Sequence, residues 1–399
     1  MDTPIEHLVP LPTPAAPLPD RASVAIIGGG IMGTSIAFHL ARAGVRDIVV
    51  VERDTLGSGS SAKPLGGVRA TFSDPGNIVL GQRSLEAFER FDREFRTDIG
   101  LRQVGYLFLC RTRAEADAIE ESAELQDRMG GDTRLLEPGE AAALNPYLDP
   151  RVLVRASFSP RDGYARPARV VAGYRAAAEE LGVVVCEHTE VLGVGSGGDS
   201  THAIHTNRGT LHADTIVIAA GAWSRGIGAM VGLDLPVEPL RRLIGVTAAS
   251  TPPPLDIPFT LDLSTTLYFH RCGDGLLVGI SHPDQAPGFG REFSHEWVPA
   301  FDHAAAVIAP SLVGANLVAG WAGLYEDTPD HNALIGRAAD VEGVLYATGF
   351  SGHGFLQGPA VGELVRDLYL GQPSFLDPAP FSAERFGDRR AHLAELHII

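Results

Sequence analysis

The segment VAIIGGGIMGTSIAFHLARAG, residues 24–44, carries the strongest structural signal in the chain. Its apolar start, residues 24–27, predicts a short strand covered on both faces, and the apolar periodicity that follows predicts a helix. Gly28, Gly30 and Gly33 form the pattern GxGxxG between the two. In this pattern the first glycine permits a tight turn, the second lets the backbone approach a pyrophosphate, and the third lets helix and strand pack closely. The segment therefore predicts a dinucleotide site at a helix N-terminus.

A second apolar strand, residues 48–51, leads directly into Glu52. A carboxylate at the end of this strand is expected to accept hydrogen bonds from a ribose 2′-hydroxyl and would repel a 2′-phosphate, which argues against NADP. Strand, glycines, helix, strand and terminal acid in this order predict a Rossmann-like α/β domain. The GxGxxG motif occurs in binding sites for both NAD and FAD, so it does not decide between these two cofactors.

Two later stretches favour FAD. Residues 215–219 predict a strand that runs into AAGAW, a second glycine turn. Residues 341–370 predict a strand, the loop GFSGHGF and a helix from Pro359 to Leu370, because proline suits a helix start. A glycine-dense loop aimed at a helix N-terminus suits a second polar end of a ligand, such as the pyrimidine edge of a flavin.

Composition excludes several other classes of protein. The chain has 399 residues, of which 45% are hydrophobic and 20% charged, which is enough for a full core in two interleaved domains. Its formal net charge of −17 offers no basic surface to nucleic acid or anionic lipid. No apolar run approaches the roughly 18 residues of a membrane span. We therefore expect no nucleic-acid partner and no membrane contact.

Cysteines and histidines give no sign of a disulfide scaffold or a metal site. The three cysteines lie far apart, which indicates a reducing compartment and, without a signal-like N-terminus, a cytoplasmic protein. One close histidine set, His202, His205 and His212, lies in a predicted hairpin without an acidic partner. Strand positions three apart point to opposite faces, so we expect no metal there.

Four stretches together resemble the D-amino-acid-oxidase-like superfamily of FAD enzymes: VAIIGGGIMGTSIAFHLARAG, IVIAAGAW, WAGLYEDTPDHNALIG and GFSGHGFLQGPAVGE. Within it the chain is most similar to the sarcosine oxidase, glycine oxidase and dye-linked L-proline dehydrogenase group, over about residues 22–385. The resemblance implies a flavoprotein that removes a hydride from the carbon beside the nitrogen of a small amine or amino acid, giving an imine that hydrolyses. The alternative is a flavoprotein subunit or assembly factor without turnover, whose Pro-rich N-terminus contacts a partner subunit.

By position, the resemblance also implies the site residues. The FAD-binding set is Gly28, Gly30, Ile31, Met32, Gly33, Glu52, Arg53, Ser60, Ser61, Gly66, Gly67, Val191, Ala220, Gly221, Gly352, His353, Gly354 and Phe355. The catalytic set is Arg69, Tyr268, His270, Tyr325 and His353. Arg69 is expected to bind a substrate carboxylate or to stabilise reduced flavin.

The sequence departs from these relatives at four positions. Gly323 replaces the cysteine that anchors flavin in monomeric sarcosine oxidases, and Lys63 stands near the place of the anchoring histidine of dimethylglycine dehydrogenases. FAD is therefore expected to bind non-covalently. Leu356 and Leu277 stand where those oxidases carry a carboxylate-binding lysine and an oxygen-activating lysine. We expect oxygen to be a slow electron acceptor and a dye or quinone to be a better one.

Cofactor-binding pieces near both ends and in the middle of the chain predict a discontinuous domain. We expect FAD binding by residues 22–88, 158–224 and 325–385, and an interleaved substrate domain of residues 89–157 and 225–324. Segments 240–248, 265–270 and 276–281 alternate, which predicts a mostly antiparallel sheet in the second domain. Residues 1–21 are expected to form a Pro-rich arm and residues 386–399 a tail.

Overall fold

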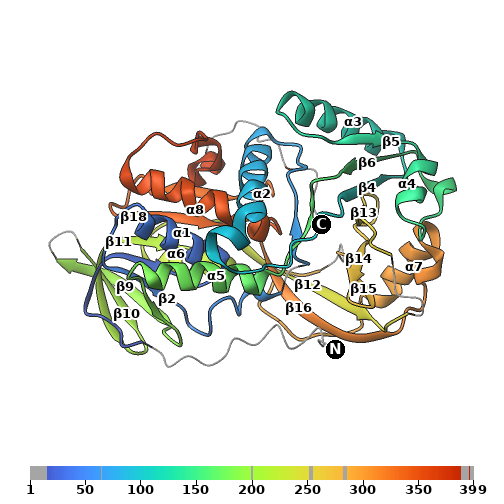
Figure 1. The fold of residues 1–399 in the computed structure, drawn as a ribbon. Coiled ribbons are helices and arrows are strands. Elements are labelled where there is room, and N and C mark those ends of the chain that lie inside the picture. Colours follow the sequence, from blue (N-terminus) through green and yellow to red (C-terminus); the bar gives the residue numbers. More distant parts are fainter. Residues whose placement is uncertain are drawn as a thin grey trace.

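The structure, a computed structural model, describes residues 16–63, 65–198, 201–250, 255–281, 285–387 and 395. Most of the Pro-rich arm and most of the predicted tail lie outside the described residues. Two units stand side by side, each built around a large sheet (Figure 1). Within the described ranges, no helix combines the length and apolar character needed to cross a bilayer.

The sheet of the first unit is parallel at its centre. Its strands follow the order β17 (Leu334–Arg337), β18 (Val344–Thr348), β11 (Gly209–Ile218), β1 (Arg21–Ile27), β2 (Ile48–Val51) and β8 (Val184–Cys186). The central strand β1 pairs in parallel with β11 and β2, so that Val24 lies opposite Thr215 and Ile48. Antiparallel β10 (Thr201–Thr206) and β9 (Val191–Gly198) continue from β11. The predicted Rossmann-like α/β fold is confirmed.

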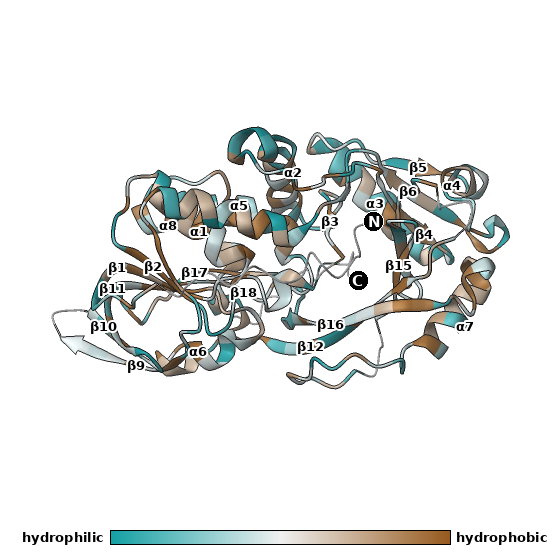
Figure 2. Cartoon of the chain, turned by 60° about the horizontal axis from the view of Figure 1, so that its bottom comes forward, coloured by the Kyte–Doolittle hydropathy of each residue, from teal (hydrophilic) through white to brown (hydrophobic). Residues whose placement is uncertain are grey.

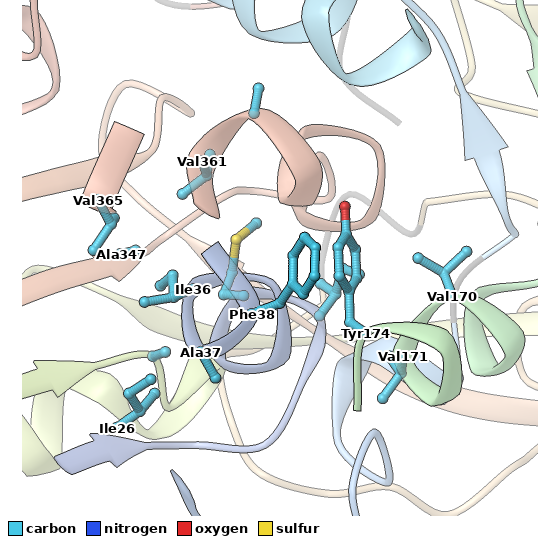
Figure 3. Close-up of a cluster of buried hydrophobic side chains, with 14 of the residues drawn as sticks. Ile26, Ile36, Ala37, Phe38, Val170, Val171, Tyr174, Ala347, Val361 and Val365 are labelled. Atoms are coloured by element: carbon cyan, nitrogen blue, oxygen red, sulfur yellow. The ribbon is translucent and has the colours of Figure 1, made fainter. Parts of the chain in front are cut away.

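Helices cover one face of this sheet. They are α1 (Ile31–Arg42), α2 (Pro75–Phe95), α5 (Pro167–Glu180) and α8 (Gly354–Leu370). Figure 3 shows α1 side chains between those of α5 and α8, with Phe38 beside Tyr174 at a ring-centroid distance of 5.6 Å. α8 approaches α1 closely, because a Cβ atom on Gly362 would lie 2.2 Å from Ser35 Oγ. The strands β9 and β10 and helix α6 (Ser224–Met230) pack on the other face.

Helix α8 begins five residues earlier than the sequence predicts, so Pro359 lies inside it rather than at its start. Proline cannot donate a backbone hydrogen bond to the preceding turn, and its ring disturbs the turn around it. The next amide, of Ala360, donates instead to Ser84 Oγ of α2 at 3.1 Å. A side chain of the neighbouring helix thus satisfies a backbone group at the irregular turn, and close packing on α1 and α2 keeps the turn helical.

The sheet of the second unit is antiparallel apart from one pair. Its order is β16 (Leu317–Asp327), β12 (Glu238–Thr247), β15 (Gly275–Gly279), β14 (Tyr268–Cys272), β13 (Phe259–Asp262), β4 (Tyr106–Cys110), β6 (Arg155–Ser159) and β5 (Arg134–Leu136). The exception is the parallel pair β13 and β4. Its helices are α3 (Arg113–Arg128), α4 (Pro138–Leu144) and α7 (Val298–Ile308). The predicted mostly antiparallel second sheet is confirmed.

Two pairs of strands connect the two units. The long paired strands β12 and β16 run from the second sheet towards the first unit (Figures 1 and 2). The short strands β3 (Gly67–Val68) and β7 (Gly163–Tyr164) pair between the units. The boundaries expected at residues 88, 158 and 325 fall inside α2, β6 and β16. Since Phe91 of α2 still packs on Tyr174 of the first core, we propose moving these boundaries to the adjacent loops.

Candidate functional site

Three adjoining cavities of about 260, 70 and 30 Å³ form a row through the first unit towards the second sheet. We call them the nucleotide cavity (around Gly28 and Glu52), the central cavity (around Tyr268 and Gly323) and the inner cavity (around Arg69). The first two share Ile31, Ser60, Ser61 and Glu326. The last two share Leu65, Tyr325, Gly352 and Phe355. Each cavity of the row therefore adjoins the next.

The glycine turn after β1 has the geometry that its motif requires. Gly28 has a φ of 113°, and a Cβ atom there would lie 2.2 Å from the Ala219 carbonyl oxygen. A Cβ atom on Gly33 would lie 1.9 Å from the Gly28 carbonyl oxygen. Gly33 lines none of the three cavities. Gly33 therefore allows the helix and the strand to pack closely, while Gly28 and Gly30 leave space for a ligand.

Glu52, at the end of β2, lines the nucleotide cavity. Its Oε2 accepts a hydrogen bond from the Gly29 amide at 2.8 Å, and its Oε1 accepts one from the Asp54 amide at 2.9 Å. Burial raises the pKa of this carboxyl group. Two backbone bonds hold the carboxylate in place at the position expected for a ribose, with lone pairs left for hydroxyl donors.

The N-terminus of α1 opens between the nucleotide and central cavities. The Ile31 amide donates to Ser61 Oγ at 2.9 Å, and Ser60 Oγ donates to the Leu324 carbonyl at 2.6 Å. The 3-10 turn Ser60–Ala62 thus places two hydroxyl groups at the positive end of a helix dipole. Amides and hydroxyls at a helix N-terminus are a donor set that suits the pyrophosphate of a dinucleotide.

Trp223 and two arginines line the nucleotide cavity together. The Arg53 guanidinium lies 3.9 Å from the centre of the Trp223 ring, and that of Arg291 lies 5.8 Å away. Phe289 stacks on the same ring at 5.6 Å. Arg53 was predicted as an FAD-binding residue, whereas Trp223 and Arg291 were not. Trp223 is the last residue of the AAGAW stretch.

Arg69 is buried, with 1% of its surface exposed, so it is no surface arginine. Its Nη1 donates to the Thr71 carbonyl oxygen, and its Nη2 lies 3.0 Å from His353 Nε2. The guanidinium also stacks on the Phe72 ring at 4.2 Å. Arg69 and His353 both line the inner cavity, so two residues 284 positions apart meet there.

A buried carboxyl group, Asp162, supports the Arg69 loop. Its Oδ1 accepts a hydrogen bond from the Ala70 amide at 3.0 Å, and its Oδ2 accepts one from Thr71 Oγ1 at 2.5 Å. Burial raises the pKa of Asp162 to about 6. The sequence analysis missed this residue, because nothing local marks a contact between positions 91 apart.

The two predicted catalytic tyrosines lie at the cavities, whereas His270 does not. Tyr325 lines the central and inner cavities, and Tyr268 lines the central one. His270 lines none of the three and stacks between Tyr164 and Phe259 at 4.5 and 4.8 Å. Burial lowers its pKa to about 4. The structure therefore places His270 among packed aromatic rings of the second unit.

Most predicted cofactor residues line this row of cavities. The nucleotide cavity is lined by Gly28, Gly30, Ile31, Met32, Glu52, Arg53, Ser60, Ser61, Val191, Ala220 and Gly221. Gly67, Gly352, His353, Gly354 and Phe355 line the central or inner cavity. Gly66 and Gly33 line none; a Cβ atom on Gly66 would lie 2.2 Å from the Ala165 carbonyl oxygen.

Three charged residues of the central cavity were not predicted as site residues. Glu326 lines the nucleotide and central cavities, and its Oε2 accepts a hydrogen bond from Thr348 Oγ1 at 3.0 Å. Burial raises its pKa to about 7. Arg242 and Lys63 line the central cavity. Leu356 lines the inner cavity, but Leu277 lies in the core of the second unit.

These cations correct one premise of the sequence analysis. Slow reaction with oxygen was expected because leucines replace two lysines near the flavin. The central cavity nevertheless carries positive charge, which Arg242 and Lys63 supply from other positions. No group of three or more potential metal ligands among His, Cys, Asp and Glu gathers within the described ranges.

Comparisons with known proteins agree with this geometry. A family model for FAD-dependent oxidoreductases matches residues 23–368. Glycine oxidase of Geobacillus kaustophilus is 33% identical over an alignment of 380 residues that covers 92% of this chain and 97% of that protein. Mouse mitochondrial dimethylglycine dehydrogenase is 31% identical, but the match spans only 45% of its length. The crystal structure of L-proline dehydrogenase from P. horikoshii superposes with a TM-score of 0.86 at 30% identity and covers 94% of this chain and all of that one. The chain belongs to the family of FAD-dependent oxidoreductases.

Proposed function

We propose that this oxidoreductase oxidises the CH–NH bond of a small amine or amino acid of the sarcosine, proline or glycine type. The observation that carries the proposal is the continuous row of cavities from Glu52 to the buried guanidinium of Arg69. Relatives named for glycine, dimethylglycine and proline support the substrate class. FAD, when bound, supplies the acceptor for a hydride.

Oxidation of the substrate does not require a side chain that acts as a base. The carbon beside a neutral amine nitrogen loses a hydride, the nitrogen lone pair completes the C=N bond, and the iminium loses its proton to water. Water then adds to the imine, which breaks down to a carbonyl compound and an amine. Oxygen or another electron acceptor removes the two electrons afterwards. We keep the cytoplasm as the proposed compartment, because Cys110, Cys186 and Cys272 are all free thiols.

The two ends of the row of cavities would bind different molecules, the cofactor at one end and the substrate at the other. The donors at the α1 N-terminus and the Glu52 carboxylate would hold the nucleotide half of FAD, and Gly352, Gly354 and Phe355 at the central cavity would hold its ring. Arg69 would bind the substrate carboxylate in the inner cavity, oriented by its contact with His353. Tyr268 and Tyr325 would enclose the substrate and exclude water.

FAD would bind without a covalent bond. A Cβ atom at Gly323 would lie 2.8 Å from the Lys63 Cβ atom, so the position of the anchoring cysteine in sarcosine oxidases has no room for a side chain. Lys63 takes the place of the anchoring histidine. The protein is expected to be yellow and to release intact FAD on acid precipitation, whereas flavin in the pellet would contradict non-covalent binding.

The function is tested by mixing the oxidised enzyme, without oxygen, with sarcosine, glycine, L-proline, D-proline and dimethylglycine. Bleaching of the flavin by one class, with a carbonyl product, is the expected result. A flavin that no amine bleaches but that chemical reductants do would favour the alternative, a flavoprotein subunit without turnover. Mixing the reduced enzyme separately with oxygen and a dye then identifies the acceptor.

A further inference from the structure

The central cavity contains two cationic side chains, Arg242 and Lys63, that form no ion pair with any residue the structure describes. Arg242, on β12, lies opposite Gly323 of β16 in the strand register and lines this cavity. Its Nε is buried without a hydrogen-bond partner in the described part of the chain, and its Nη1 reaches only the Arg241 carbonyl at 3.4 Å. Its guanidinium lies over the Tyr325 ring at 5.0 Å.

Two other arginines of the chain do have acidic partners. Arg241, the preceding residue, forms an ion pair with Glu296, and the buried Arg385 pairs with Asp330. Among the described residues, no carboxylate lies within ion-pair distance of Arg242. Lys63, the only lysine in the sequence, lines the same cavity and likewise has no carboxylate partner there.

The one acidic residue of the central cavity does not offset these charges. Glu326 has a pKa of about 7, so near neutral pH it carries only part of a negative charge. It is also held by Thr348 at 3.0 Å. The phosphates of FAD belong at the α1 N-terminus, and the oxidised flavin ring is neutral. A partly buried cation without a partner is costly, which favours an anionic ligand.

Tyr325 connects this charge to Arg69, because its ring lines both the central and the inner cavity. A ligand that lies along Tyr325 would meet Arg69 at one end and Arg242 at the other. We propose that the substrate is a small secondary amine with a carboxylate on each side of the nitrogen, and that Arg242 binds the second carboxylate. This inference rests on the proposed function, since it places the amine nitrogen between the two arginines.

The test compares two ligands that differ in one charge: N-(carboxymethyl)glycine and its mono-amide, N-(carbamoylmethyl)glycine. Stopped-flow bleaching of the oxidised holoenzyme gives the rate and the apparent Kd for each. We expect the wild type to prefer the diacid. Arg242→Met should lower the specificity for the diacid about 30-fold more than that for the amide, because the second carboxylate then loses its charged partner in a partly buried site. Arg241→Met, which removes a cation outside the cavities, should leave the preference unchanged.

Two results would overturn the inference. An equal loss for both ligands, together with a shifted flavin midpoint potential, would assign Arg242 to the reduced flavin. An unchanged preference in Arg242→Met would show that the guanidinium meets no ligand charge. If no amine bleaches the flavin, the proposed function fails. In that case the charge preference of Arg242 is tested by ligand binding alone. The diacid should perturb the oxidised flavin spectrum at a lower concentration than the amide in the wild type, but not in Arg242→Met.

Discussion

In the proposed function, the buried Arg69 side chain binds the substrate carboxylate. Replacing Arg69 with Ala should remove about 2 to 4 kcal/mol of transition-state stabilisation for an amino acid, because a buried charge pair loses one partner. An amine without a carboxylate should lose much less. The measurement is kcat/KM for both substrates, with Arg113→Ala on exposed α3 as control. Equal losses for the two substrates would instead assign Arg69 to the flavin.

The Glu326 carboxyl group makes stability depend on pH in a specified direction. Burial raises its pKa from 4.5 to about 7, so the folded chain holds a proton that the unfolded chain releases. Its contribution to stability is therefore full below about pH 4.5 and is lost as pH rises to about 7 and above.

We consider the protein without FAD. As the pH rises from about 4.5 to about 7, the free energy of unfolding of the wild type should fall by about 1 to 3 kcal/mol relative to that of Glu326→Gln. Denaturant unfolding of both proteins across this range measures the difference. Parallel pH curves would show that Glu326 is ionised in the folded protein.

Helix α8 shows how an irregular element is stabilised from outside. Pro359 interrupts the backbone hydrogen bonding of the helix, and Ser84 Oγ of α2 accepts a hydrogen bond from the Ala360 amide. Ser84→Ala should cost about 1 to 3 kcal/mol of unfolding free energy, because it leaves a buried amide without a partner.

Ser122→Ala is the matched control, since its hydroxyl bonds only within its own helix, to the Ala118 carbonyl. That variant should cost less than about 1 kcal/mol. Similar unfolding free energies for the two variants would mean that α8 satisfies the amide by itself.

Elements differ in how far the sequence predicts them. The β1 to β2 unit follows from local apolar runs and from glycines whose spacing has a steric cause, so it is predicted closely. His270 was assigned to the site because its segment, like that of Tyr268, resembles an active-site strand of the family. Two residues along a strand move a side chain about 7 Å, which takes His270 out of the cavity. Alternation along a strand predicts which face a side chain occupies, but not how far it lies from a ligand.

For the whole molecule, charged residues of the site were the hardest to predict. Asp162, Arg242 and Glu326 lie on loops or strands where a charged side chain usually indicates a solvent-facing position. Their burial results from the docking of two units that are interleaved along the chain, which local patterns do not contain. Arg69 was predicted because it lies just after a pair of glycines, and Glu52 because it ends the second strand of the Rossmann-like unit.

The most direct test of the central claim is a single turnover without oxygen. Holoenzyme is mixed with one equivalent of the amine that bleaches it best, and reduced flavin and carbonyl product are measured in the same sample. The account predicts one carbonyl compound per flavin reduced, and slower bleaching when the carbon beside the nitrogen carries deuterium. Reduced flavin without a carbonyl product, or no bleaching by any amine, would contradict it.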